Sequence, residues 1–192
     1  METKKRVAIF GGSFNPIHNG HIALAQSVIN QGLADEVWLL VSPQNPLKKQ
    51  GDLLDEQKRL TLAERALDGE KNIKVSDFEF TLPRPSYTWN TLQALSRAYP
   101  ECKFKLLVGA DNWNVFDKWA HYNDILSHYE ILVYPREGYD INTASLPPSV
   151  SLIHAPLFPI SSTDIRHMVH EGEDIQSYIP IIIEEDVKLL YS

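Results

Sequence analysis

The sequence predicts one α/β domain, doubly wound, with a mainly parallel sheet and a C-terminal helical segment. Apolar runs such as residues 7–10, 37–41 and 104–108 are typical of strands buried on both faces. Longer segments with apolar residues at helical spacing alternate with these runs, and this alternation is typical of parallel sheets with crossover helices. The 192 residues suffice for a substantial core, so we expect a single domain over residues 1–192.

Local signals place the individual elements. The expected strands lie over residues 7–10, 36–41, 73–80, 104–108, 129–134 and 150–154. The expected helices cover residues 22–29, 55–67, 86–98 and 121–128, a segment entered through residues 160–166, and residues 180–190. Gly32 is typical of a helix stop, and Asp55 is typical of a helix N-cap. A strand, a helix and a second strand at this spacing form a right-handed parallel crossover, so we expect a Rossmann-like arrangement.

Composition and charge exclude several classes of protein. Hydrophobic residues make up 43% of the chain and charged residues 22%, as in ordinary globular proteins. The formal net charge of −7 argues against nucleic-acid binding, which needs a basic face. Cys102 is the single cysteine, so we expect no disulfide framework and a reducing, cytoplasmic location. The first apolar run is too short for a signal peptide and no segment approaches a membrane span, so no membrane partner is expected. The sequence leaves a homo-oligomer open.

The stretch after the first expected strand carries the clearest chemical pattern. It reads Gly11-Gly12-Ser13-Phe14-Asn15-Pro16-Ile17-His18-Asn19-Gly20-His21. Glycines let the backbone approach an oxyanion closely, and the helix that follows directs free N–H groups and a partial positive charge toward it. The two histidines are three residues apart at the start of the helix, so both imidazoles can face the strand ends. This stretch therefore predicts a nucleotide-phosphate site.

Other interpretations of this stretch can be compared by what is missing. No lysine follows the glycines as in Gly-x-x-x-x-Gly-Lys-Ser/Thr, and the spacing Gly-x-Gly-x-x-Gly is also absent. Two satisfied histidines at a helix start, or half of a metal site, are the structural alternatives. A metal pair needs further His, Cys or carboxylate ligands at matching spacing, and none lies nearby, so we expect no protein-built metal site.

A second constellation precedes the helix near the C-terminus. Ser161, Ser162 and Thr163 stand before it, although an N-cap needs one hydroxyl. Arg166 follows within about the first turn, where the helix dipole disfavours a cation, so we expect an anion to compensate it. The hydroxyls, amides and guanidinium together predict a second triphosphate-binding surface. The alternative is an ordinary cap beside a solvated arginine.

Together the two motifs resemble those of the nucleotidylyltransferase superfamily. The motifs are Gly-Gly-Ser-Phe-Asn-Pro-x-His-x-Gly-His near the N-terminus and Ile-Ser-Ser-Thr-x-Ile-Arg near the C-terminus. Within the superfamily the chain is similar to bacterial nicotinate mononucleotide adenylyltransferases. Three further stretches carry that similarity, namely Pro85-Ser86-Tyr87-Thr88, Gly109-Ala110-Asp111-Asn112 with Trp119 downstream, and Pro135-Arg136 with Gly138-Tyr139. The resemblance covers almost the whole chain in the same order.

The resemblance implies transfer of the adenylyl group of ATP to nicotinate mononucleotide, with release of pyrophosphate and with Mg²⁺ on the phosphates. Magnesium usually keeps several waters and few protein ligands, which agrees with the absence of a motif for it. The catalytic residues that the resemblance implies are His18, His21 and Arg166. The ATP-binding residues that it implies are Gly11, Gly12, Ser13, Phe14, His18, His21, Ser161, Ser162 and Arg166. The substrate-binding residues that it implies are Asn15, Lys48, Tyr87, Thr88, Asp111, Trp119 and Arg136.

The sequence departs from the family's pattern in two places. The loop after the second expected strand often reads Pro-Pro-His-Lys in this family, and here it reads Asn45-Pro46-Leu47-Lys48, so the histidine's role is absent or filled by a lysine. Asn15 stands where many bacterial members carry aspartate. A core aromatic is the alternative for Trp119, and a solvated loop end is the alternative for Arg136.

Two other functions compete with this one. Phosphopantetheine adenylyltransferases belong to the same superfamily, but they are usually shorter and carry Thr where His18 stands. A non-catalytic nucleotide-binding module that kept the fold is the alternative from another class. Such a module would be expected to lose one of the two histidines or Arg166, and this chain retains all three.

Overall fold

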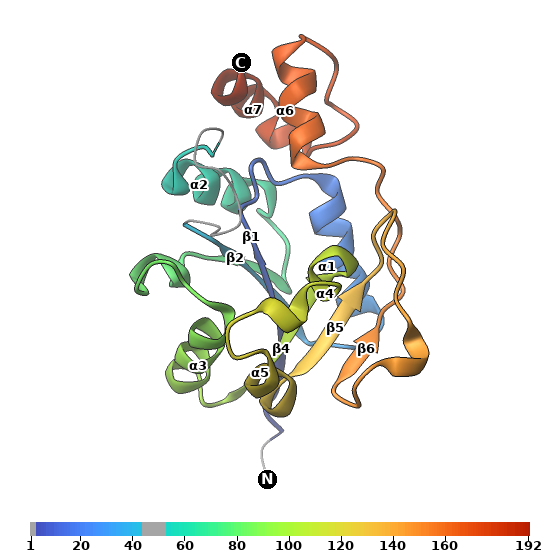
Figure 1. The fold of residues 1–192 in the computed structure, drawn as a ribbon. Coiled ribbons are helices and arrows are strands. Elements are labelled where there is room, and N and C mark those ends of the chain that lie inside the picture. Colours follow the sequence, from blue (N-terminus) through green and yellow to red (C-terminus); the bar gives the residue numbers. More distant parts are fainter. Residues whose placement is uncertain (1–2, 44–52) are drawn as a thin grey trace.

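The computed structural model describes residues 3–43 and 53–192, and within them six strands form one sheet. The strands are β1 (Lys5–Gly12), β2 (Glu36–Val41), β3 (Ile73–Ser76), β4 (Cys102–Gly109), β5 (Glu130–Tyr134) and β6 (Val150–Leu152). The α-helices are α1 (Asn19–Asn30), α2 (Glu56–Ala66), α3 (Thr88–Ala98), α4 (Ala110–Trp113), α5 (Tyr122–His128), α6 (Ser162–His170) and α7 (Glu184–Tyr191). Short 3₁₀ segments are η2 (Phe78–Thr81), η3 (Phe116–Lys118), η4 (Thr143–Ser145) and η5 (Ile181–Ile183) (Figure 1).

The sheet has the strand order β3-β2-β1-β4-β5-β6, and all of its paired strands run parallel. The chain therefore adds β2 and β3 on one side of β1, and then β4, β5 and β6 on the other side. β1 and β4 are neighbours, with Ile9 opposite Leu106. In sheets of this kind, ligands bind beyond the carboxyl ends of the strands at the point where the order reverses. That point lies here between the ends of β1 and β4.

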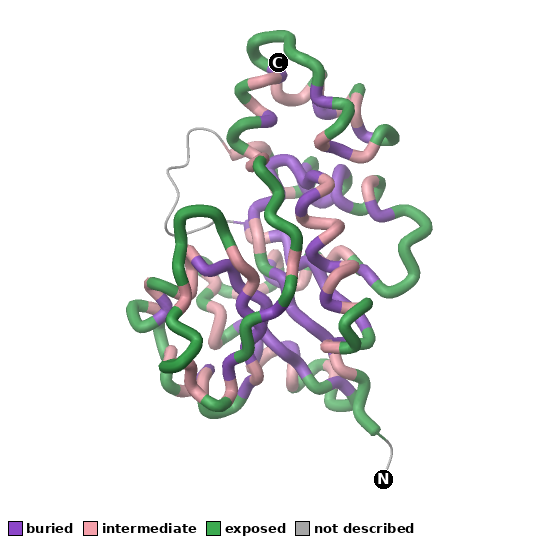
Figure 2. The backbone as a smooth tube through the Cα atoms, turned by 90° about the vertical axis from the view of Figure 1, so that its right-hand side faces the viewer, coloured by how far each residue is buried: buried purple, intermediate pink, exposed green. Residues whose placement is uncertain are grey.

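Helices cover both faces of the sheet, and alternating side chains of β2 show how the two layers form. Val37, Leu39 and Val41 pack into a core with α1, α2 and the C-terminal helices. Trp38 and Leu40 pack into a second core with α3 and α5 on the other face. Every residue of β2 is buried, as Figure 2 shows for the strands at the centre of the molecule. The near-continuous apolar run at residues 36–41 reflects this two-sided burial.

The predicted doubly wound α/β fold is confirmed, together with several of its local signals. Asp55 caps α2 by accepting from the backbone N–H groups of Gln57 and Lys58. Gly32 has a φ of +66° just beyond the end of α1, in the left-handed region that favours glycine. Cys102 is buried at the start of β4. None of the described helices is both long enough and apolar enough to cross a membrane.

Several predicted element ends differ from the structure, and three of them illustrate why. The strand expected over residues 73–80 ends at Ser76, because the Ser76 hydroxyl accepts the Phe78 N–H and turns the chain into η2. The strand expected over residues 150–154 ends at Leu152. The last expected helix, residues 180–190, begins as η5 and continues as α7.

Candidate active site

The loop between β1 and α1 presents two histidines that are locked together by the helix start. His18 is the N-cap of α1, and its Nδ1 accepts the Gly20 N–H at 3.2 Å. The Nδ1 of His21 accepts the His18 N–H at 3.2 Å, which completes a reciprocal capping box. The two rings stack with their centroids 3.7 Å apart. The spacing His-x-Gly-His thus serves the helix cap and pairs the imidazoles at once.

This cap also determines which ring nitrogen of each imidazole carries the proton. A ring nitrogen that accepts an amide proton has no proton of its own, so each neutral ring carries its proton on Nε2. Burial, followed by the positive charge of Arg136, lowers the pKa of His18 to about 4. His18 is therefore neutral at physiological pH and presents an Nε2–H donor.

The start of α6, which carries the C-terminal motif, packs against the loop between β1 and α1. The Ser162 hydroxyl donates to the Pro16 carbonyl at 2.9 Å, and the Arg166 guanidinium donates to the Asn15 carbonyl at 2.8 Å. Figure 1 shows α6 and α7 lying together beyond the end of β1. The start of α6 is thereby fixed against the histidine turn.

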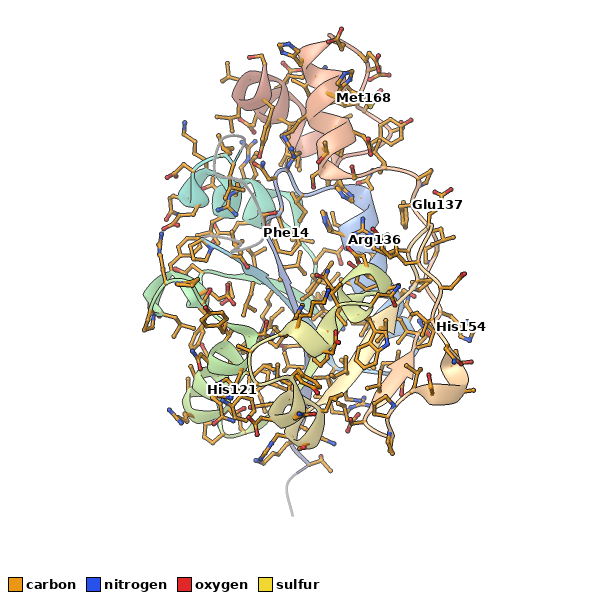
Figure 3. All side chains as sticks on the ribbon, in the orientation of Figure 1. Phe14, His121, Arg136, Glu137, His154 and Met168 are labelled. Carbon is orange, nitrogen blue, oxygen red and sulfur yellow. The ribbon has the colours of Figure 1, made fainter. Side chains whose placement is uncertain are left out.

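We use the name histidine pocket for the cavity lined by His18, His21, Asp111, Arg136, Ser161 and Asp164, with Leu24, Leu157 and Phe158 among its apolar residues. Asp164 forms a capping box with Ser161 at the start of α6 and accepts from its N–H at 2.8 Å. Arg136 lies between α1 and α4 (Figure 3). Imidazole N–H donors, a guanidinium and an apolar wall are suited to a phosphorylated ligand with a flat base.

We use the name tryptophan pocket for the neighbouring cavity lined by Gly11, Gly12, Glu79, Tyr87, Thr88 and Trp119. The Trp119 Nε1–H is buried and has no hydrogen-bond partner in the described structure. α3 begins at this pocket, and the side chain of its N-cap Tyr87 makes no capping hydrogen bond. The first N–H groups of α3 are therefore available to an anion.

Glu79 contributes a buried carboxyl group to the tryptophan pocket. It is 7% exposed and accepts from the hydroxyls of Thr91 at 2.8 Å and Ser86 at 3.2 Å. Burial raises the pKa of Glu79, and these hydroxyls offset part of that effect. Among the described residues, the Glu79 carboxyl group has hydroxyl donors rather than a cationic partner.

The two pockets adjoin at the carboxyl ends of β4 and β5. Arg136 donates to Oδ2 of Asp111 at 3.2 Å, while the buried Oδ1 of Asp111 has no partner among the described residues. Phe10 and Tyr134 line both pockets. The arrangement can hold two ligands end to end, with their adjoining ends near Asp111.

Comparison with known proteins identifies the family. A family model described as cytidylyltransferase-like matches residues 9–168. The "Probable nicotinate-nucleotide adenylyltransferase" of Bacteroides fragilis (strain YCH46) is 48% identical over 92% of this chain and 88% of its own length. The protein of the same name from Porphyromonas gingivalis is 42% identical over 93% of this chain and 91% of its own length. This chain belongs to the nicotinate-nucleotide adenylyltransferase family.

Solved structures share the fold of this family member. The nicotinic acid mononucleotide adenylyltransferase of Plasmodium falciparum, solved in complex with NaAD, superposes with a TM-score of 0.79. It is 21% identical, and the match covers 97% of each chain.

The structure brings most of the predicted site residues to the two pockets. The histidine pocket receives His18, His21, Asp111, Arg136 and Ser161. The tryptophan pocket receives Gly11, Gly12, Tyr87, Thr88 and Trp119.

Five predicted residues lie outside both linings, for a packing reason. Phe14 is buried with its ring edge-on to His21 at 5.0 Å, and Figure 3 labels it beside β1. The buried Asn15 amide oxygen accepts from the Tyr191 hydroxyl at 2.8 Å, while Ser162 and Arg166 hold the carbonyls of this loop. The Ser13 carbonyl accepts from the fully buried Arg59 at 2.6 Å. These residues hold the loop between β1 and α1 in place without lining either pocket. Lys48 lies outside the described residues.

Among the pocket residues that had no site role in the sequence-based prediction, four matter most for the geometry. Glu79 falls in a segment predicted as strand, where its burial was not visible. Tyr134 was assigned to a strand end, and Asp164 is the variable position of the late motif. Gly109 has a steric role, because a Cβ there would lie 2.9 Å from Cδ of Arg136 and 3.0 Å from Cζ of Tyr134. Position at the carboxyl end of a parallel strand is the signal that marks Gly109 and Tyr134.

Proposed function

We propose that this chain transfers the adenylyl group of ATP to nicotinate mononucleotide, forming deamido-NAD and pyrophosphate. The observation that carries the proposal is the pair of adjoining pockets at the β1/β4 reversal, one with the capped histidines and one with Trp119 and the open start of α3. Membership of the nicotinate-nucleotide adenylyltransferase family supports the same reaction.

The histidine pocket is the proposed ATP site. The Nε2–H groups of His18 and His21 donate to phosphate oxygens, and the apolar wall around Phe158 accommodates the base. Ser161 and the N–H groups at the start of α6 contact the far phosphates. Arg166, whose guanidinium holds the Asn15 carbonyl, maintains the loop that carries the histidines.

The tryptophan pocket is the proposed acceptor site. The pyridine ring lies against Trp119, and its carboxylate accepts from the uncapped N–H groups of α3 near Tyr87 and Thr88. This contact needs an anion, so it favours nicotinate over the neutral amide of nicotinamide.

The reaction needs positioning and charge stabilisation. The attacking 5′-phosphate oxygen is already an anion, so it forms a bond to the α-phosphorus of ATP without a protein base, and the bond to pyrophosphate breaks. Positioning supplies on the order of 7–11 kcal/mol in such reactions. A single well-placed donor such as a histidine supplies about 3–4 kcal/mol.

Magnesium fits this site through one carboxylate. Among the described residues, no group of three or more His, Cys, Asp or Glu side chains is arranged to hold a metal ion. Oδ1 of Asp111 is a buried acceptor with no partner in that part of the chain, so we propose that it faces a water of phosphate-bound Mg²⁺ or a ribose hydroxyl. The ion supplies neutralisation of phosphate charge.

The direct test is pyrophosphate release by the purified protein with ATP and Mg²⁺, measured for nicotinate mononucleotide, nicotinamide mononucleotide and phosphopantetheine. We expect the highest kcat/KM with nicotinate mononucleotide and chromatographic detection of deamido-NAD. Equal use of the two pyridine mononucleotides would refute the carboxylate contact. Release with phosphopantetheine alone, or with no acceptor, would refute the proposed function.

A further inference from the structure

We propose that the Tyr134 hydroxyl is a further catalytic group, which donates a hydrogen bond to a phosphate oxygen where the two substrates meet. The inference rests on the proposed adenylyl transfer and adds to it a residue outside both end motifs. Its basis is the position of this side chain, the groups that converge around it and the state of its hydroxyl.

Tyr134 is the last residue of β5 and lines both the histidine pocket and the tryptophan pocket. The other described residue common to both is Phe10, which carries no polar group in its side chain. The Tyr134 ring meets the Phe10 ring edge-on at 5.9 Å, so the phenol is fixed by packing that does not involve its hydroxyl. Tyr134 is therefore the polar side chain positioned to reach ligands in both pockets.

Three side chains converge above Gly109, at the end of β4. A Cβ built on Gly109 would lie closest to Oδ1 of Asp111, then 2.9 Å from Cδ of Arg136 and 3.0 Å from Cζ of Tyr134. The carbon that bears the Tyr134 hydroxyl thus lies beside the Asp111–Arg136 ion pair. The lack of a side chain at position 109 is what allows this convergence.

The Tyr134 hydroxyl remains available as a donor. It makes no hydrogen bond to another residue of the described ranges, whereas the hydroxyl of Tyr129 lies 3.0 Å from that of Ser96 and accepts from Gln93 at 3.3 Å. Burial raises the pKa of Tyr134 to about 12, and the charge of Arg136 opposes this only in part. The phenol therefore keeps its proton at physiological pH.

The chemistry at this position calls for a neutral donor. As the bond from the acceptor phosphate to the α-phosphorus forms and the bond to pyrophosphate breaks, negative charge is shared among the oxygens at the meeting point of the substrates. A fixed phenol O–H directed there stabilises that charge and retains its proton throughout. The titratable groups that share the histidine pocket with it are His18, His21, Asp111, Arg136, Glu137, Tyr139 and Asp164, and those that share the tryptophan pocket are Glu79, Tyr87 and Lys118.

The test compares Tyr134→Phe with Tyr129→Phe, a matched control whose hydroxyl is bonded to α3. Tyr134→Phe keeps the ring against Phe10, so we expect its melting temperature to match that of the wild type. Its kcat for deamido-NAD formation should fall roughly 10- to 100-fold, with both KM values within about twofold, because the donor acts on charge that develops in the transition state. Tyr129→Phe should keep the wild-type kcat.

Two results would overturn the inference. One is a Tyr134→Phe kcat within about twofold of the wild type, and the other is a rise in KM with an unchanged kcat. Site-specific replacement of Tyr134 by 3,5-difluorotyrosine provides a second test, because fluorination lowers the phenol pKa. We expect this variant to lose kcat at alkaline pH where the wild type does not, and a parallel profile would contradict the donor role. Wild-type protein without any adenylyl transfer would refute the proposed function itself, a result distinct from either.

Discussion

At the amino-terminal edge of the sheet, Glu36 accepts hydrogen bonds from Lys5 at 2.9 Å, Lys74 at 3.1 Å and the Trp38 indole at 2.8 Å. At the opposite edge, Glu79 accepts from the hydroxyls of Thr91 and Ser86. Burial acts to raise the pKa of both carboxyl groups. The donors around Glu36 reverse that effect and bring its pKa to about 2, whereas the pKa of Glu79 stays raised.

The pKa shifts of other titratable groups differ between the two edges of the sheet in the same way. Hydrogen bonds from Lys103 and Lys105 lower the pKa of Glu130 to about 2 at the amino-terminal edge. At the carboxyl-terminal edge, burial lowers the pKa of His18 to about 4 and raises that of Tyr134 to about 12. One edge pairs its charges within the protein and gains stability. The other holds desolvated polar groups that line pockets, where a ligand can complete their interactions, and of these His18 and Tyr134 are neutral at physiological pH.

The largest expected effect tests the carboxyl-terminal edge through His18. His18→Ala removes the imidazole donor and the cap of α1, whereas His18→Asn retains a side chain that can cap a helix. We expect both variants to lose roughly 10²–10³-fold in kcat for pyrophosphate release. His18→Ala should also lose about 1 kcal/mol of unfolding free energy relative to His18→Asn. A wild-type kcat in His18→Asn would show that the imidazole does not act on the phosphates.

The pH dependence of stability checks the same residue. The pKa of His18 falls from 6.5 to about 4 on folding, so between these values the unfolded chain binds more protons than the folded one. The wild type should therefore lose stability as the pH falls from 6.5 toward 4, and His18→Asn should lose less. Urea denaturation of both proteins across this range measures the difference, and equal slopes would contradict the burial effect.

A smaller effect is expected from closing the space above Gly109. In Gly109→Ala the new Cβ would meet Asp111, Arg136 and Tyr134, so these side chains must shift. We expect a loss of about 1–3 kcal/mol in unfolding free energy and roughly a tenfold loss in kcat/KM. Gly11→Ala is the matched control for stability, since a Cβ there meets nothing within 4 Å. Equal melting temperatures of the two variants would contradict the convergence above Gly109.

The smallest expected effect compares the two carboxyl groups directly. At pH 7, Glu36→Gln should lose about 1–2 kcal/mol of unfolding free energy, a value reduced by solvent screening of its half-exposed lysine partners. Glu79→Gln should match the wild type or exceed it by up to about 1 kcal/mol, because it removes a desolvated carboxyl group.

The two carboxyl groups should also differ in the sign of their pH dependence. The lowered pKa of Glu36 provides stability that is present above pH 4.5 and lost as the pH falls toward 2. The raised pKa of Glu79 removes stability as the pH rises above 4.5, so any gain in Glu79→Gln should disappear in acid. Denaturant titrations at pH 7 and in acid measure both trends, and the same sign in the two variants would contradict the contrast between the edges.

Local chemistry explains how much of the fold the sequence could predict. The run at residues 36–41, the cap at Asp55 and the stop at Gly32 each depend on a few neighbouring residues, and each matches the structure. The strand predicted through residue 80 was too long, because the turn at Ser76 depends on a single hydroxyl. Element ends follow such individual contacts more than they follow the apolar pattern.

The sequence by itself determined the alternation of strands and helices, and it determined the histidine turn, whose capping box lies within four consecutive residues. The tertiary structure decided that Glu79 faces a pocket and that Arg166 holds a loop carbonyl. It also decided that Tyr134 stands beside Asp111. These outcomes depend on strand register and on packing between elements far apart in the chain. Patterns of neighbouring residues do not specify the distances between side chains on different elements, whereas the assembled sheet does.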